Sequence, residues 1–125
     1  MGAGQAMQES PIFVKTDQML MWLMGCTDRF PKSHRFRMAR RLEDPAFAFQ
    51  EQIQAALRPK GADRLAAADV QLALLKRRLR MAHEMKLIDL RHYEHGARLT
   101  AELGRLLGAW TKRKGNVVPA GEANT

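Results

Sequence analysis

One predicted helix, residues 66–83 (AAADVQLALLKRRLRMAH), constrains the fold of this chain more than any other segment. At about 100° per residue, its apolar side chains and those just beyond its ends fall into two stripes on roughly opposite faces. The first stripe consists of Leu65, Ala68, Leu72, Leu75, Leu79 and Ala82. The second consists of Ala67, Val70, Leu74, Met81, Met85 and Ile88. A small bundle covers only one such face, so the second stripe predicts contact with a further apolar surface.

The same helix contains four cations, Lys76, Arg77, Arg78 and Arg80. Lys76 and Arg80 lie side by side along an edge between the stripes, because residues four apart are neighbours on a helix. Arg77 lies further round that side, and Arg78 lies across the helix. Like charges at this spacing destabilise a helix slightly, so we expect an anionic partner over Lys76 and Arg80.

The composition predicts a single all-α domain. Ala, Leu, Met, Arg, Glu and Gln dominate, and 125 residues with 46% hydrophobic content are enough to bury a core. No apolar run is long enough to span a membrane, and the sequence MGAGQAMQES lacks the features of a signal peptide. The single cysteine, Cys26, has no intramolecular disulfide partner. We therefore expect a soluble cytoplasmic protein that contacts no membrane.

The net charge of +8 is distributed unevenly. Residues 1–31 contain two basic residues and three acidic ones, so the positive excess lies entirely after Pro31. Such a surface favours partners rich in phosphate or carboxylate. The alternative is that these lysines and arginines only keep a helical surface solvated.

Proline and glycine divide the chain into four predicted helices. The first spans residues 12–29, and its apolar face consists of Ile12, Met19, Leu20, Leu23 and Phe30. It ends before Pro31, because proline disfavours helical geometry in the residue before it. The second spans residues 34–57, with Ser33 as its N-cap. Its apolar positions are Phe36, Ala39, Leu42, Ala46, Phe49, Ile53 and Leu57. Pro45 lies inside this pattern, where it either kinks the helix or begins a second piece capped by Asp44.

The third predicted helix follows the break at residues 59–61 and runs to about residue 88. The fourth follows Asp89 as N-cap and runs to about residue 112. Its core stripe is Tyr93, Ala97, Thr100, Leu103, Leu107 and Trp110. Three glycines lie along or beside this stripe, and each costs about 1 kcal/mol relative to alanine, so we expect another backbone to approach closely there.

Four helices with short connections predict an antiparallel up-down four-helix bundle over residues 11–114. The small and polar residues at 1–10 and 115–125 predict disordered tails.

The sequence contains no motif that indicates catalysis. It has no glycine-rich phosphate loop, no nucleophile motif and no inward-facing pair of carboxylates, so we expect no catalytic residues and no enzyme activity. His92 and His95 flank Glu94, but no second helix supplies a complementary His or Cys pair, so we expect surface histidines and neither a metal nor a cofactor. Cys26 lies on the apolar side of the first helix, which predicts a buried, inert thiol.

Several segments, in this order, resemble a known family. They are KTDQMLMWLM, FPKSHRFRMARRLE, AAADVQLALLKRRLRMAHEMKLID, and a tyrosine-led helix ending in LGRLLGAWTKR. Over residues 12–114 they resemble the accessory variability determinant (Avd) proteins of diversity-generating retroelements. That family is related to the four-helix-bundle proteins encoded in intervening sequences of bacterial 23S rRNA genes.

The resemblance implies a homopentameric, barrel-like assembly of four-helix bundles that binds a reverse transcriptase together with template RNA or cDNA. It also implies that Lys76 and Arg80 occupy the family's basic positions, whereas Arg77 and Arg78 stand where relatives can be apolar. The resulting hypothesis is a non-catalytic accessory protein that supports mutagenic retrohoming. The alternative is a protein-interaction scaffold of the intervening-sequence type, with no direct role in nucleic-acid binding.

Two sets of residues follow from this hypothesis. We expect nucleic-acid contacts from Lys76, Arg80, Arg77, Arg78, Arg37, Arg40, Arg41, Arg105, Lys112 and Arg113. We expect the oligomer interface to include Val70, Leu74, Met81 and Met85. If Leu74 and the two methionines instead fold inward around a kink at Pro45, the protein is a monomer.

Overall fold

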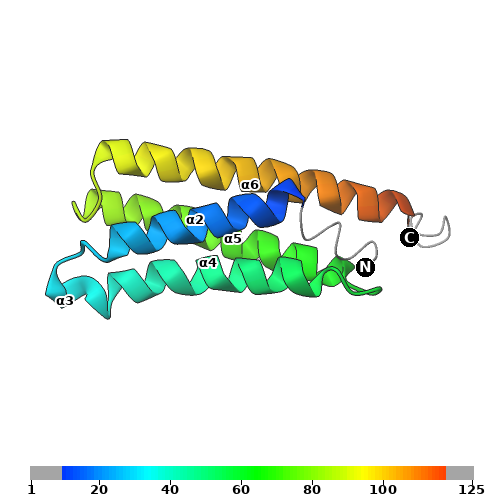
Figure 1. The fold of residues 1–125 in the computed structure, drawn as a ribbon, viewed down its shortest axis with the longest axis horizontal. Helices are drawn as coiled ribbons and strands as arrows, with labels where there is room; N and C mark the ends of the chain where they lie inside the picture. The colour runs from blue at the N-terminus through cyan, green and yellow to red at the C-terminus, as the bar shows by residue number, and fades with distance from the viewer. Residues whose placement is uncertain (1–9, 118–125) are drawn as a thin grey trace.

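The computed structural model describes residues 10–117, which form four long helices and one single-turn helix, without strands in that range. The elements are α2 (Pro11–Thr27), α3 (Lys32–Arg35), α4 (Met38–Ala55), α5 (Ala62–Glu84) and α6 (Leu90–Val117). Figure 1 shows the four long helices packed side by side. The all-helical bundle predicted from the sequence is confirmed.

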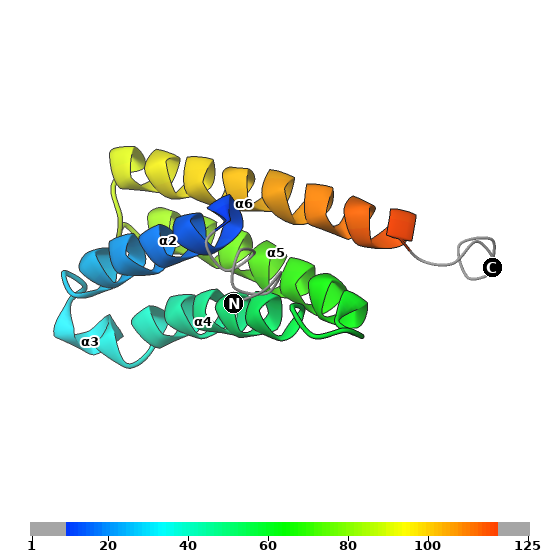
Figure 2. The ribbon, with the colours of Figure 1, turned by 45° about the vertical axis from the view of Figure 1, so that its right-hand side comes forward.

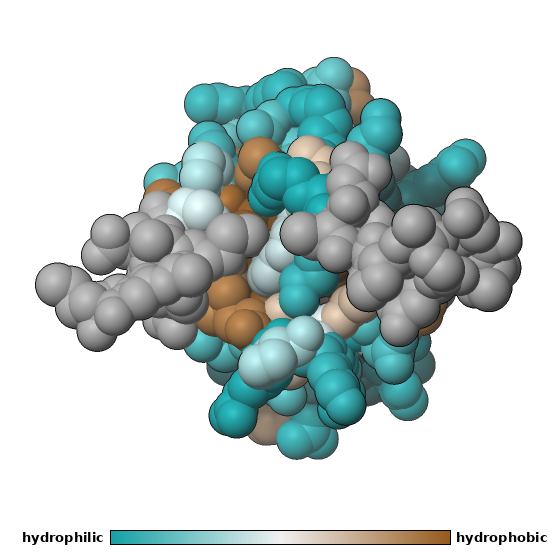
Figure 3. All heavy atoms as spheres, turned by 90° about the vertical axis from the view of Figure 1, so that its right-hand side faces the viewer, coloured by the Kyte–Doolittle hydropathy of each residue, from teal (hydrophilic) through white to brown (hydrophobic). Residues whose placement is uncertain are grey.

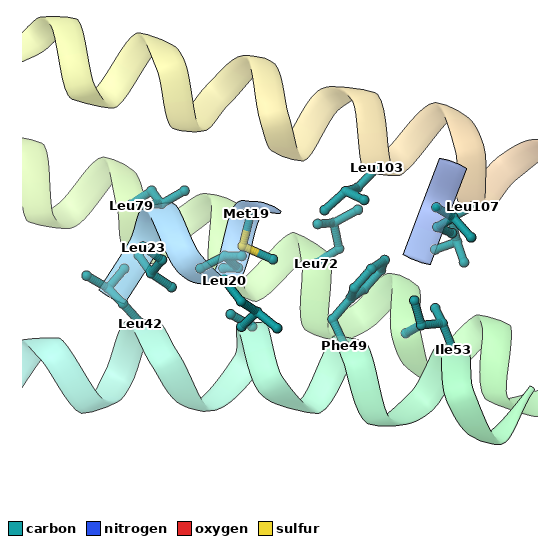
Figure 4. Close-up of a cluster of buried hydrophobic side chains, with 14 of the residues drawn as sticks. Met19, Leu20, Leu23, Leu42, Phe49, Ile53, Leu72, Leu79, Leu103 and Leu107 are labelled. Carbon is teal, nitrogen blue, oxygen red and sulfur yellow. The ribbon is translucent and has the colours of Figure 1, made fainter. Parts of the chain in front are cut away.

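Each long helix packs against two others, since α4 contacts α2 and α5, and α6 contacts the same two helices. Consequently α2 and α5 lie across the bundle from each other (Figure 1). Side chains from all four helices meet in one core (Figure 4). Its labelled members include Leu23 of α2, Phe49 of α4, Leu72 of α5 and Leu103 of α6, all at most 2% exposed.

The first predicted helix is confirmed, although α2 ends at Thr27, two residues early. Its expected apolar face, Ile12, Met19, Leu20, Leu23 and Phe30, is buried as predicted. The first stripe of the third helix is also buried throughout. The bundle core therefore follows the hydrophobic periodicity of these two helices.

The second predicted helix is wrong at its start, because the chain breaks between α3 and α4. Ser33 lies inside α3 and is not an N-cap. Phe36, expected in the core, is 83% exposed. Phe30 and Met38 are buried at this end of the bundle instead, at 2% and 9% exposure. The break turns Phe36 away from the stripe that continues through Ala39 and Leu42.

Pro45 does not split α4, so Asp44 caps no second helix there. The proline is buried inside a continuous helix and cannot donate the hydrogen bond that residue 45 would give to the carbonyl of Arg41. The guanidinium of Arg78 on α5 donates to that carbonyl instead, over 2.9 Å. A side chain of the neighbouring helix thus replaces the missing backbone donor.

The last two helices differ from the prediction in their bounds. Helix α5 ends at Glu84, because Lys86 takes a positive φ of 64° and the chain turns there. Helix α6 continues to Val117 rather than ending near residue 112, so residues 115–117 of the predicted tail are helical. Its last turns extend beyond the neighbouring helices (Figure 2). The rest of the predicted tails, residues 1–9 and 118–125, lies outside the described residues.

Two expectations for α6 need correction. Thr100, Leu103, Leu107 and Trp110 are buried, but Tyr93 is only half-buried and Ala97 is exposed. The close approach expected at the glycines occurs at Gly96, where a Cβ would lie 2.6 Å from the ring of Trp22, a side chain and not a backbone. At Gly108 a Cβ would meet no described atom within 4 Å.

Of the described helices, none combines the length and the apolar content that crossing a membrane requires.

Candidate nucleic-acid interface

The cations of α5 point in different directions. Lys76 lies in the groove between α5 and α6, where its Nζ would be 3.5 Å from a Cβ on Gly104. A Cβ at position 104 would make only an ordinary van der Waals contact with the ammonium group, so Lys76 does not require glycine there. Lys76 also lines a cavity of about 200 Å³ together with Tyr93 and Thr100. The side chain is exposed, so its charge remains accessible to a ligand on that side of the bundle.

Arg80 forms an ion pair with Glu84 one turn further along α5, at 3.3 Å. Both side chains are mostly exposed, 73% and 65%, and such surface pairs contribute little to stability. A phosphate group can therefore compete with Glu84 for the guanidinium at little energetic cost. Arg77 is exposed as well.

Arg78 has a structural partner that the sequence did not reveal. Its guanidinium donates to the carbonyl of Arg41, the group that Pro45 leaves without its usual donor. This hydrogen bond joins α5 to α4 and orients Arg78 along α4. The signal was present in the sequence, since a proline inside a helix always frees the carbonyl four residues earlier.

A dense group of cations surrounds the break between α3 and α4. Residues 29–41 (RFPKSHRFRMARR) contain six lysines and arginines and no acidic residue. These cations are Arg29, Lys32, Arg35, Arg37, Arg40 and Arg41, all exposed. We call residues 29–41 the basic segment. Helix α4 begins within it, and its first turn has no acidic residue and no side-chain cap among the described residues.

The start of α6 differs from the start of α4. Asp89 accepts a hydrogen bond from the backbone N–H of His92 over 2.8 Å, as expected of an N-cap. The imidazole Nδ1 of His92 lies 2.7 Å from the same carboxylate oxygen. These hydrogen bonds from His92 hold the pKa of Asp89 below its usual value. The N-cap predicted at Asp89 is confirmed.

The remaining predicted contacts lie on α6. Arg105 is paired with Glu102 one turn earlier on the helix. Lys112 and Arg113 are exposed near the C-terminal end of α6. Helix α3, which is part of the basic segment, lies at the opposite end of the bundle (Figure 1). Figure 3 shows hydrophilic residues at the top and bottom of the end of the molecule where α6 terminates, with some hydrophobic residues visible between them. The structure thus distributes the ten predicted residues over several surfaces, and a hydrogen bond links two of them from different helices, Arg78 of α5 and Arg41 of α4.

The second apolar stripe of α5 is exposed where the sequence placed an interface. Val70 is 62% exposed, Met81 45% and Met85 42%, while Leu74 is half-buried. The two methionines do not fold inward around Pro45, which removes the packing proposed for a monomer. Ile88 is an exception, since it lies beyond the end of α5 and is buried at 7% exposure.

A further exposed apolar face lies on α2 and was missed in the sequence. Val14 is 45% exposed, Met21 63% and Met24 37%. Val14 and Met21 are seven residues apart, which places them on one side of the helix. Because α2 and α5 lie across the bundle, their two apolar faces point in opposite directions.

Three of the four histidines and the cysteine have partners or positions that explain them, whereas the buried Nδ1 of the fourth, His34, has no hydrogen-bond partner among the described residues. His92 is bonded to Asp89, His95 lies against Trp22 with ring centroids 5.4 Å apart, and His83 stacks on Tyr93 at 5.0 Å. Among the described residues, no three His, Cys, Asp or Glu side chains are grouped closely enough to hold a metal ion. Cys26 is buried, and burial raises the pKa of its thiol despite the opposing charge of Arg29.

Comparison with protein families gives a match over most of the chain. Residues 12–114, which include the four long helices almost entirely, match the family described as bAvd-like. No curated protein sequence matches the chain.

Proposed function

The chain belongs to the bAvd-like family, and from this membership we propose that it is a non-catalytic accessory protein of a diversity-generating retroelement. In this role it binds the retroelement's reverse transcriptase and its template RNA or cDNA in the cytoplasm, and supports mutagenic retrohoming. The family match over residues 12–114 carries the proposal. The exposed cations of α4, α5 and α6 support the nucleic-acid part, because phosphate contacts need accessible lysine and arginine side chains.

We propose that the bundle has antiparallel up-down topology and assembles into a homopentamer, with Val70, Leu74, Met81 and Met85 in the subunit contact. Two exposed apolar faces on opposite sides of one bundle support this arrangement. When the α5 face of one subunit packs on the α2 face of the next, the contact is head-to-tail, and such contacts close into a ring when each subunit is rotated by a fixed fraction of a full turn relative to the one before it.

The assembly is tested by light scattering over a range of concentrations. We expect an oligomer at micromolar concentration, and we expect Met81→Glu to dissociate it, because a carboxylate would be buried in the contact. Ala109→Glu, an equal change at another exposed helix position, serves as the control. A wild-type monomer at micromolar concentration would contradict the oligomer.

Nucleic-acid binding is tested by its dependence on salt. We expect the affinity for single-stranded RNA to fall steeply with salt, with log K losing roughly 0.7 per tenfold increase in salt for each phosphate neutralised. The double variant Lys76→Ala with Arg80→Ala should flatten this slope by roughly 0.7 to 1.4. Arg58→Ala with Arg64→Ala removes the same charge from exposed positions outside the predicted set and should change the slope less.

The scaffold related to the intervening-sequence proteins remains the second candidate function. Its supporting observation is the pair of exposed apolar faces, which need a protein surface but no nucleic acid. No measurable RNA binding at low salt, or equal slopes for the wild type and the Lys76/Arg80 double variant, would favour this scaffold.

A further inference from the structure

Phe36 is exposed to a degree that is unusual for an aromatic side chain. The chain has eight aromatic residues, all within residues 10–117, and Phe36 is the only exposed one, at 83%. Phe13, Phe30, Phe49 and Trp110 are buried, and Trp22, Phe47 and Tyr93 are half-buried. Since burial of a phenyl ring stabilises a fold, the free energy of folding alone does not account for this position.

The local sequence would place Phe36 in the core if the helix were continuous. Phe36, Ala39 and Leu42 share the spacing of the buried stripe of α4. The chain breaks at Phe36 and Arg37 instead, where Arg37 takes φ −107° and ψ −83°. The ring therefore reaches solvent because of a specific break in the backbone between α3 and α4.

The residues near Phe36 in the sequence are largely cationic. Lys32, Arg35, Arg37, Arg40 and Arg41 lie within five residues of it and are exposed. The ring also lines a hollow of about 420 Å³ with Thr27, Asp28, Arg35, Ala39 and Glu43. The carboxylate of Glu43 accepts a hydrogen bond of 2.5 Å from the hydroxyl of Thr27.

We propose that Phe36 is a stacking platform for an unpaired nucleobase, and that the cations of the basic segment hold the adjoining phosphates. The ligand class is single-stranded nucleic acid, so this inference rests on the proposed function and specifies the site and the form of the nucleic acid. Aromatic rings beside cations bind single strands in this way, because every base has a π-face and every linkage has a negative charge. Asp28 and Glu43 repel phosphate, so the base, and not the backbone, lies over the hollow.

Two other partners fit these observations less well. A protein partner packed on Phe36 would have to supply several acidic side chains to match the five neighbouring cations, and Asp and Glu are depleted in protein interfaces. In a duplex the bases are already stacked and paired, so their faces are not available to a phenyl ring. An unpaired base can stack on the ring while the adjoining phosphates pair with the cations.

The test compares three ligands of equal length by fluorescence anisotropy: a single-stranded oligonucleotide, the same strand with abasic sites, and a duplex. The abasic strand keeps the phosphates and lacks the bases. We expect the wild type to bind the normal strand roughly tenfold more tightly than the abasic strand, and Phe36→Leu to lose this preference. Phe36→Trp should keep it. Because position 36 is exposed, all three proteins should have the same melting temperature.

Each alternative gives a different result. If Phe36→Leu keeps the wild-type preference for the normal strand, or lowers the affinity for the normal strand, the abasic strand and the duplex by the same factor, stacking on Phe36 is wrong. The proposal that the protein binds nucleic acid is then unaffected. If Phe36→Leu changes the particle mass in light scattering, Phe36 belongs to a subunit contact and the inference is wrong. If the wild type binds no oligonucleotide at low salt, the proposed nucleic-acid function fails as well.

Discussion

Helix α4 breaks two local rules, one in its middle and one at its start, and the structure compensates for only one of them. In the middle, Pro45 removes a backbone donor, and Arg78 of α5 supplies the missing hydrogen bond to Arg41. At the start, three arginines stand where the helix dipole favours anions, next to an exposed phenylalanine. No described side chain neutralises that arrangement.

The difference separates cations that maintain the fold from cations that await a partner. Arg78 resembles a ligand-binding residue in the sequence, because it belongs to a run of basic residues, yet it has a structural role. The side chain of Arg37 at the start of α4 forms no hydrogen bond or ion pair with the described residues. Unfavourable local arrangements persist where function requires them, so the start of α4 is the better candidate for binding.

The largest expected effect on stability concerns Arg78. Arg78→Ala removes the donor to the Arg41 carbonyl, and we expect the free energy of unfolding to fall by about 1 kcal/mol, which is below the usual range for a charged donor because the site is exposed. In a Pro45→Ala background, residue 45 regains its N–H and can donate to that carbonyl itself. The effect of Arg78→Ala should then largely disappear. Urea denaturation of the wild type, the two single variants and the double variant measures this as a coupling free energy of about 1 kcal/mol between positions 45 and 78.

Arg77→Ala is the matched control for Arg78→Ala, because it removes the same charge from the next residue on the exposed side of α5. We expect it to change the stability by less than about 0.5 kcal/mol. Equal effects of Arg78→Ala with and without Pro45 would mean that the hydrogen bond does not compensate for the proline. The middle of α4 would then be no better compensated than its start.

The bundle core was predictable because its signal is periodic. Leu72, Leu75 and Leu79 repeat at helical spacing, and a repeated pattern tolerates an error of a residue or two at either end. Phe36 fits the same pattern and was assigned to the core, wrongly. A break of one residue in the backbone depends on competition among Phe30, Phe36 and Met38 for the buried space, and periodicity carries no information about that competition.

The candidate site was less predictable than the fold. The cations themselves are visible in the sequence, but their directions depend on packing: Lys76 points toward α6, Arg78 toward α4, and Arg80 toward Glu84. The apolar face of α2 was missed because Val14 and Met21 lie among other apolar residues, so their exposure appears only once the buried face is known. Tertiary contacts decide which of the cationic and apolar side chains in a helix remain exposed to a partner.

The smallest expected effect tests the second half of the contrast, the start of α4. Arg37 lies three residues before Arg40 and four before Arg41, so Arg37→Glu replaces two repulsive charge pairs with attractive ones. It also places an acidic side chain at the positive end of the helix dipole. We expect it to raise the free energy of unfolding by about 0.5 kcal/mol. The same charge reversal in the last turn of α6, Lys114→Glu, should lower it by a similar amount, since a cation there already suits the dipole. Thermal melts measure both changes in stability.

Fluorescence anisotropy should show that Arg37→Glu weakens single-strand binding although it stabilises the fold. We expect these opposite effects because a cation that binds phosphate here also destabilises the start of the helix. If Arg37→Glu destabilises the protein, the arginine has a structural partner after all, and the start of α4 resembles its middle.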